Sequence, residues 1–415
     1  GTFFQQLYNT IDTVIVGQFV GKAALASVGG SATQLINLVV GFFTGLSSGA
    51  SVVIAQFFGA NDDRSVKESL HTAHAFSILG SIVISALGIG LAPQLLRWMN
   101  TPEELLADST LYLRIYFAGI LFVFIFNVGS SILRAVGDSK NPLYYLIACC
   151  FINIFLDLLF VIVFHLGVAG VAYATFLSQA ISALLVTHKL MTSHSILTLK
   201  IRDIRLHKNV LKSQLWIGLP AGFQSVMYSI SNVIIQAALN RFGTDTVAAW
   251  SAYGKLDAIF WMVSGAIGIS ITTFVGQNYG ARKYDRVHKS VRICLGIDSI
   301  ISVILIVFLM LFRVPLFRLF TQDPSVIRIG SDMLALITPC YIFFVFIEVL
   351  AGALRGMGDV MIPTLITLLG VCVLRLIWIA VVLQISPTVN AIIYSYPVTW
   401  IATAVLFIIY YLYKK

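Results

Sequence analysis

The chain has 415 residues, of which 58% are hydrophobic and only 11% are charged, whereas soluble domains carry about 25% charged residues. This composition excludes a water-soluble globular protein. The formal net charge of +9 does not indicate a nucleic-acid partner, because the basic residues gather in the connections between apolar segments.

Apolar segments follow one another along the whole chain, each long enough to cross a hydrocarbon core of about 30 Å as a helix. Strands would show an alternation of apolar and polar residues, which these segments lack. We therefore expect an all-α polytopic membrane protein with twelve transmembrane helices. Their boundaries are expected at about 3–20, 25–58, 71–96, 109–135, 142–165, 168–190, 213–242, 246–279, 287–312, 325–357, 362–385 and 389–413.

The basic residues predict the orientation of the spans. If the N-terminus is inside, the even-numbered connections and the C-terminus hold 18 Lys and Arg residues, and the odd-numbered connections hold seven. This asymmetry follows the positive-inside rule. We therefore expect a multi-pass protein of the bacterial plasma (inner) membrane with both termini cytoplasmic.

Two sequence motifs recur at one spacing. LRAVGDSKNP begins at Leu133 and recurs as LRGMGDVMIP at Leu354 (354 − 133 = 221), and AQFFGANDDRSV at Ala55 recurs as GQNYGARKYDRV at Gly276 (276 − 55 = 221). Six spans separate the copies, so the repeats are parallel, which favours a substrate cavity between two halves. We expect an N-terminal six-helix lobe at 1–190, a cytoplasmic linker at 191–212 and a C-terminal six-helix lobe at 213–415.

The repeated Gly-Asp turns predict connection geometry and not chemistry. Gly137 and Gly358 suit the C-terminal caps of helices, where a positive φ is common. Pro142 and Pro363 suit the first turn of the helix that follows.

Charged side chains within predicted spans need an explanation, because an ionised group in the bilayer costs from about 3 to more than 10 kcal/mol. Asp12 lies in the middle of the first span. Asn153 and Asp157 lie in the fifth span, four residues apart, and therefore share a helix face. Their oxygens suit a hard cation, or one carboxylate could carry a proton. The alternative is a set of buried polar groups that only joins neighbouring helices.

The repeat offers a test of these alternatives. At the spacing of 221, Asn153 and Asp157 correspond to Leu374 and Trp378, and at 220 Asp12 corresponds to Asn232. If the acids only joined helices, the second copy would be expected to need them too. Their restriction to one half favours a specialised site.

The second half carries other intramembrane charges, Lys255, Asp257, Glu348 and Arg375. Arg375 could pair with Glu348 or Asp257, and a structural salt bridge is as good an interpretation as a role in coupling. Polar and aromatic residues within spans are candidates for the wall of the substrate cavity, where aromatic faces attract organic cations. The candidates are Gln34, Asn37, Gln179, Gln224, Tyr228, Asn232, Tyr253, Asp257, Glu348 and Arg375.

The chain resembles the multidrug and toxic compound extrusion (MATE) transporters over essentially its whole length. The resemblance is carried by IDTVIVGQFVG from Ile11, LSSGASVVIAQFFGA from Leu46, NIFLDLLF from Asn153, GVAGVAYAT ending at Thr175, and the two Gly-Asp motifs. It implies two six-helix bundles forming a V. It also implies a cation-coupling site made of Asp12, Asn153, Asp157 and Thr175, with the first three as metal ligands if the coupling ion is Na⁺. Some members have a proline in the first helix, whereas the first proline here is Pro93.

We therefore expect a secondary active antiporter that exports cationic amphipathic drugs or toxins in exchange for H⁺ or Na⁺ by alternating access. The alternative is a lipid-linked oligosaccharide flippase of the same superfamily, which would favour a strongly cationic cavity. The sequence has no HExxH motif, and nothing else in it indicates an enzyme. We expect no cofactor besides the coupling ion. The expected partners are small organic cations and membrane lipid, without nucleic acid, and we expect a monomer.

Overall fold

A computed structural model describes residue 11 and residues 15–99, 101–193 and 196–414. The chain forms two compact units, which divide between residues 222 and 223. Every regular element in the described ranges is a helix. This finding confirms the expected all-α class.

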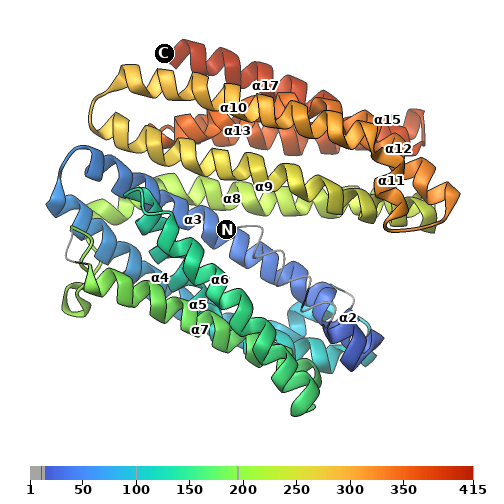
Figure 1. Ribbon diagram of the computed structural model, residues 1–415, viewed down its shortest axis with the longest axis horizontal. Helices are drawn as coiled ribbons and strands as arrows, with labels where there is room; N and C mark the ends of the chain where they lie inside the picture. Colours follow the sequence, from blue (N-terminus) through green and yellow to red (C-terminus); the bar gives the residue numbers. More distant parts are fainter. Residues whose placement is uncertain (1–10, 12–14, 100, 194–195, 415) are drawn as a thin grey trace. The chain divides into compact units, whose positions relative to one another are not determined.

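Unit 1 is a bundle in which α5 packs against α3, α4 and α7, and α6 packs against α7 (Figure 1). Its described elements are η1 (Val16–Val20), α2 (Lys22–Gly29), α3 (Ser31–Gly59), α4 (Asp63–Trp98), α5 (Glu103–Ala135), α6 (Lys140–Asp157), η2 (Leu158–Val163), α7 (Gly167–Thr192), η3 (Ile201–Asp203) and the first part of α8 (Lys208–Leu239).

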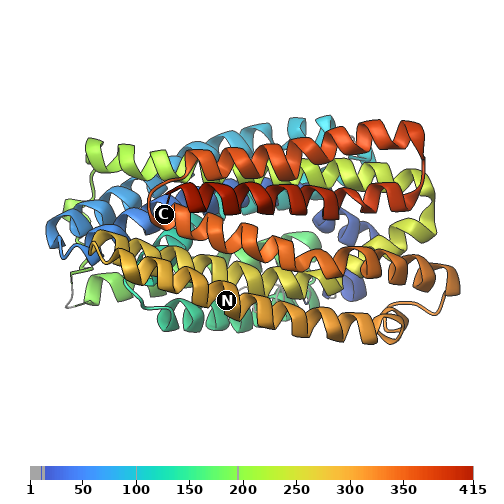
Figure 2. The same ribbon diagram turned by 90° about the horizontal axis from the view of Figure 1, so that it is seen from above.

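Unit 2 is built around α9 and α13, and α10 lies alongside α9 (Figure 2). It holds the rest of α8, then η4 (Asn240–Phe242), α9 (Thr244–Gly280), α10 (Tyr284–Leu311), α11 (Arg313–Arg318), α12 (Pro324–Ile337), η5 (Thr338–Cys340), α13 (Tyr341–Gly356), α14 (Met361–Thr367), η6 (Leu368–Val373), α15 (Leu374–Ile385), α16 (Val389–Ile393) and α17 (Ser395–Lys414).

Within the described ranges, nine helical segments are long and apolar enough to cross a membrane, and the bent helix α5 makes a tenth. The helix α8 occupies the expected seventh span, but it is not among these ten. Most of the expected first span, 3–20, lies outside the described residues. The number of apolar helices therefore agrees with a polytopic membrane protein.

The bend in α5 has a local cause. The segments on either side of Gly119 differ in direction by 47°. A Cβ at Gly119 would lie 2.8 Å from the Phe176 ring of α7. Because glycine weakens a helix interior and admits a close neighbour, α5 bends where α7 presses against it.

The turns of the two copies have the same backbone geometry. Gly137 and Gly358 have φ values of 94° and 87°, and each amide donates to the carbonyl three residues earlier at 2.9 Å. Asn61 and Arg282 have φ values of 56° and 57°, again 221 residues apart. The expected caps and the internal repeat are confirmed.

The first part of α8 packs unusually closely against α3. A Cβ at Gly49 would lie 2.2 Å from the Gln214 carbonyl oxygen, and a Cβ at Gly218 would lie 2.5 Å from the Leu46 carbonyl oxygen. Such small-residue faces let helix backbones approach one another in a membrane. The helix α8 therefore starts as part of unit 1 and continues, past Pro220, into unit 2.

Residues 196–207, within the expected linker, are tied to α4. The Lys200 amide donates to Nε2 of His71 at 3.1 Å, and the His207 amide donates to the Thr72 hydroxyl at 3.2 Å. These bonds hold the polar segment against one end of the unit 1 bundle.

Candidate functional site

The described part of the predicted cation site lies inside unit 1. Asn153 and Asp157 are on α6 with exposed fractions of 1% and 0%, and Thr175 on α7 is also buried. Asp12, the fourth predicted member, lies outside the described residues. The three described side chains thus bring an amide, a carboxylate and a hydroxyl into the interior of one bundle.

Two contacts fix the register of α6 against α7. The thiol of Cys149 donates to the Ser178 carbonyl at 3.5 Å, and a Cβ at Gly170 would lie 3.2 Å from the backbone carbon of Phe160. The helices are therefore antiparallel neighbours. Interpolating between these two contacts places Asn153 of α6 at nearly the same height along the helix pair as Thr175 of α7. The two side chains therefore lie in one layer of the bundle.

Two of these side chains need a partner that the described protein atoms do not supply. Among the described residues, neither the amide oxygen and nitrogen of Asn153 nor the hydroxyl of Thr175 has a hydrogen-bond partner. A buried polar group left without one costs about 1–3 kcal/mol. An amide oxygen, a hydroxyl and a nearby carboxylate are the oxygen ligands that a hard cation prefers, so this donor set fits Na⁺ as well as a proton carried by Asp157.

Irregular helix turns adjoin this site. Asp157 is the last residue of α6, and the π-helix η2 begins directly after it. A second π-helix, η1, begins four residues after position 12 and packs against η2. Because π-turns are rare and concentrate at functional sites, their position next to Asp157 supports an interpretation beyond helix packing.

Asp257 in unit 2 has a different environment. Its carboxylate accepts hydrogen bonds from the Tyr341 hydroxyl at 2.5 Å, the Trp261 indole at 2.6 Å and the Tyr253 hydroxyl at 3.1 Å. All three donors are neutral and aromatic. The carboxylate thus accepts from neutral donors, and none of the ion pairs found among the described residues involves it.

The suggested salt bridge between Arg375 and Asp257 or Glu348 is wrong. Arg375 is buried and donates to the Thr399 hydroxyl at 3.2 Å, and its guanidinium carbon lies 4.0 Å from the centroid of the Tyr396 ring. Every ion pair found among the described residues involves other side chains. Arg375 thus contacts a hydroxyl and an aromatic face, and its Nε has no hydrogen-bond partner among the described residues. Sequence spacing alone could not distinguish these neighbours from a carboxylate.

The remaining cavity candidates differ in burial. Gln34, Asn37 and Asn232 are exposed, Gln179, Gln224, Tyr228 and Glu348 are partly buried, and Tyr253 is buried; Lys255, whose role was left open, is exposed. Glu348 lies against Gly268, where a Cβ would be 2.1 Å from its carboxylate oxygen. The exposed polar residues on α3 and α8 have side chains available to a ligand.

Sequence reasoning missed part of the aromatic cluster in unit 2. Phe260 stacks on Tyr341 with ring centroids 3.9 Å apart, and Trp400 packs edge-on against Tyr396 at 5.5 Å. The spacing of Tyr253, Asp257 and Trp261, each four residues apart, was a usable signal that they share one face of α9. Nothing in the apolar run of α13 distinguished Tyr341.

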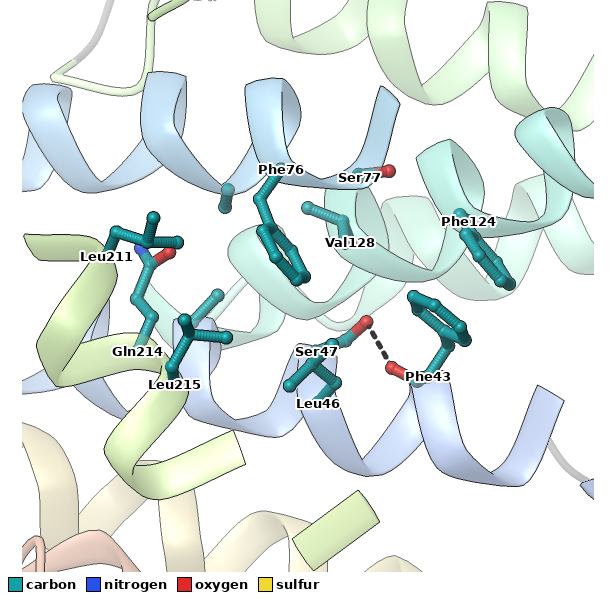
Figure 3. A pocket seen from close by; sticks show the side chains of 12 residues that line it. Phe43, Leu46, Ser47, Phe76, Ser77, Phe124, Val128, Leu211, Gln214 and Leu215 are labelled. Carbon is teal, nitrogen blue, oxygen red and sulfur yellow. Dashed lines mark hydrogen bonds between the residues drawn. The ribbon is translucent and has the colours of Figure 1, made fainter. Parts of the chain in front are cut away.

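A small cavity in unit 1 is not a drug site. It lies between α3, α4, α5 and the start of α8, and Figure 3 shows Phe76 pointing from α4 toward α3. Its volume is about 20 Å³, which is the size of a single water. Gln214 uses its amide to donate to the Ser69 carbonyl at 2.9 Å, so this cavity is a packing feature.

Comparisons with known proteins agree on the family. Residues 1–159 and 220–381 match the family model MatE. The probable multidrug resistance protein YpnP of Bacillus subtilis is 32% identical over 383 residues, covering 90% of this chain and 84% of that protein. A FAD transporter of Shewanella oneidensis is 27% identical over 341 residues, covering 80% of this chain and 74% of that protein.

A solved structure has the same fold. It is described as the outward-facing conformation of a multidrug resistance MATE family transporter of the MOP superfamily. The TM-score is 0.93 at 21% identity, over 100% of this chain and 92% of the other. The family model covers well over half of the chain, and the fold and apolar helices agree with it. The chain belongs to the MATE family of membrane transporters.

Proposed function

We propose that this protein is a secondary active exporter of cationic amphipathic compounds, driven by H⁺ or Na⁺ entering the cell. The observation that carries the proposal is the buried oxygen set on α6 and α7 of unit 1. Asp157 is fully buried, and the neighbouring Asn153 and Thr175 have polar atoms without a partner among the described residues. A site that binds and releases a cation accounts for the free-energy cost of burying these atoms without a partner among the described residues.

The role proposed for each residue follows from its chemistry. Asp157 carries the proton or balances the charge of Na⁺, while Asn153 and Thr175 supply neutral oxygens. Asp12 is proposed as the second carboxylate, because η1 begins four residues after it in the sequence and packs against η2, which begins directly after Asp157. Two acids in one site favour uptake of a cation, because like charges raise the affinity for H⁺ or Na⁺.

Coupling arises if the cation and the drug favour opposite orientations of the transporter. A ligand shifts such an equilibrium only by its difference in affinity between the two states. One pH unit supplies about 1.4 kcal/mol, and 100 mV adds about 2.3 kcal/mol for each net charge moved. Exchange of one proton for one monovalent drug moves no net charge, so strong accumulation needs a second cation or a neutral substrate.

The substrate class is proposed from unit 2. Asp257 is partly exposed and Trp261 is 37% exposed, so a carboxylate and an indole face are open to a ligand, and both attract organic cations. The buried Tyr253 and Tyr341 hold the carboxylate in place. One relative is described as a FAD transporter, which suggests an anionic substrate as the alternative. We favour a cation, because Arg375 is only 2% exposed and therefore closed to a ligand, whereas the Asp257 side chain is partly exposed.

The test uses the full chain in proteoliposomes with Na⁺ and pH gradients imposed separately. Efflux of a fluorescent organic cation is followed for the native protein, Asp157→Asn and Asp12→Asn, with Asp108→Asn, an exposed acid on α5, as the control. We expect gradient-driven efflux to be lost in the first two variants and kept in the control. Full gradient-driven efflux by Asp157→Asn would remove the proposed site, and transport of a pyrophosphate-linked lipid without cation efflux would favour the flippase.

A further inference from the structure

A basic pocket lies in unit 2 where α10 ends, and the family assignment gives it no role. It has a volume of about 500 Å³ and is lined by Arg313 and Arg318 of α11 and Arg328 of α12, together with Gln322, Ser331 and Asp332. We propose that this pocket binds the phosphate head group of an anionic phospholipid at the membrane surface.

The charge of the pocket calls for an anion. Three arginines and one acid, Asp332, line the pocket, and none of the ion pairs found among the described residues involves these four side chains. Arginine binds phosphate oxygens in a bidentate manner and is weakly hydrated, so it suits an interfacial anion. The uncompensated charge on the lining is therefore available to a ligand.

The fold holds the arginines in place. Phe317 of α11 is fully buried, and a Cβ at Gly330 of α12 would lie 2.2 Å from its ring. This contact locks α11 against α12, and the arginines at 318 and 328 lie within two residues of it. The Gln322 amide donates to the Arg318 carbonyl at 3.2 Å and closes the intervening turn.

The backbone amides at the start of α12 do not attract the anion, because they are already bonded. The Asp323 carboxylate accepts from the Ser325 amide at 2.8 Å and from the Val326 amide at 3.5 Å. The helix N-terminus is thus already capped by an acid. The guanidinium groups are what the pocket offers an anion.

The surroundings favour a lipid over a soluble phosphate. Leu311, Phe312, Leu319 and Phe320 flank the arginines, and the two leucines are 72% and 77% exposed. The apolar span of α10 ends at Leu311, so the pocket lies where hydrocarbon meets head groups. Acyl chains would cover the exposed apolar side chains while the phosphate sits among the arginines.

The first copy of the repeat lacks these features. At the spacing of 221, Arg313 and Arg328 correspond to Ala92 and Ala107, and Arg318 alone keeps a basic counterpart, Arg97. The helix α4 runs on to Trp98 without a separate α11, and the connection that follows carries Glu103 and Glu104. The basic pocket therefore distinguishes the second copy from the first.

The test measures lipid binding to the purified full chain in neutral detergent by native mass spectrometry. Phosphatidylglycerol is compared with phosphatidylcholine, and inorganic phosphate is a separate arm. Each basic residue near an anionic surface contributes a factor of about five. We therefore expect phosphatidylglycerol to bind about a hundredfold more weakly when Arg313, Arg318 and Arg328 are all changed to Gln.

The control removes the same charge elsewhere, with Arg97→Gln, Arg282→Gln and Arg286→Gln combined, and should change binding less than about threefold. Asp332→Asn should strengthen binding, a gain that misfolding cannot produce. Equal binding by native protein and the Arg313, Arg318 and Arg328 variant would overturn the proposal. If inorganic phosphate binds as tightly as phosphatidylglycerol, the proposal that the bound phosphate belongs to a lipid is wrong.

Discussion

Unit 1 and unit 2 share their turns but place these acids in different surroundings. In unit 1, Asp157 is fully buried beside Asn153 and Thr175, whose polar atoms have no partner among the described residues. In unit 2, Asp257 accepts from three neutral aromatic donors. The repeated turns set the scaffold in both copies, whereas the interior positions diverged. In the proposed function, ion binding therefore belongs to the first copy and recognition of an organic cation to the second.

The largest effect is expected from making unit 1 resemble unit 2. Asn153→Leu introduces the residue found at the matching position, Leu374. A hydrogen bond to a charged group contributes about 1.5–3 kcal/mol, so coupling-ion affinity should fall at least about tenfold. The measurement is the ion concentration for half-maximal efflux in proteoliposomes, with Asn153→Asp expected to retain binding. Unchanged ion dependence in Asn153→Leu would contradict the role given to this amide.

A smaller effect is expected in unit 2. Tyr341→Phe removes the shortest bond to Asp257, made at 2.5 Å, and should weaken drug binding by several fold. Its pH or Na⁺ dependence should stay that of the native protein. The measurement is drug binding by fluorescence at two pH values, with Tyr411→Phe as the control. A changed ion dependence would show that the units do not divide the two tasks.

A stability difference is expected between two glycines of unit 1. Gly49→Ala should lower the free energy of unfolding by about 1–3 kcal/mol, because the new methyl group meets the backbone of α8. Gly90→Ala has nothing within 4 Å and should be neutral or stabilising, since alanine favours helix. Thermal unfolding in detergent compares the two variants. Equal melting temperatures would contradict the close packing of α3 and α8.

The smallest effect concerns the start of α4. Asp62 accepts from the Ser65 amide at 3.0 Å, and its hydrogen bonds with Ser65 lower its pKa below 3.8. A lowered pKa stabilises the fold above the unfolded value, and the contribution is lost as the pH falls through the folded value. The difference in melting temperature between native protein and Asp62→Ala should therefore shrink from pH 7 to about pH 3. A constant difference would contradict this cap.

Most of the fold could be predicted from the sequence, because hydrophobic length and the repeated turns are local signals. Gly137 and Gly358 adopt the expected positive φ, since few other residues tolerate it. The partners of Arg375 could not be predicted, because Thr399 and Tyr396 come close only after α15 and α17 pack. Likewise, Asn153 and Asp157 could be placed on one face, but the layer shared with Thr175 depends on the register of two helices.

The helix α8 has a consequence for how this gene can be divided. Its first turns pack against the backbone of α3 at Gly45 and Gly49, while its later turns belong to the second unit. If the gene were divided before Lys208 and the halves were expressed separately, the first polypeptide would lack α8. The glycine face of α3 that α8 covers would then be exposed. We expect that fragment to associate with its other half or to be degraded, so the duplicated halves are no longer interchangeable modules.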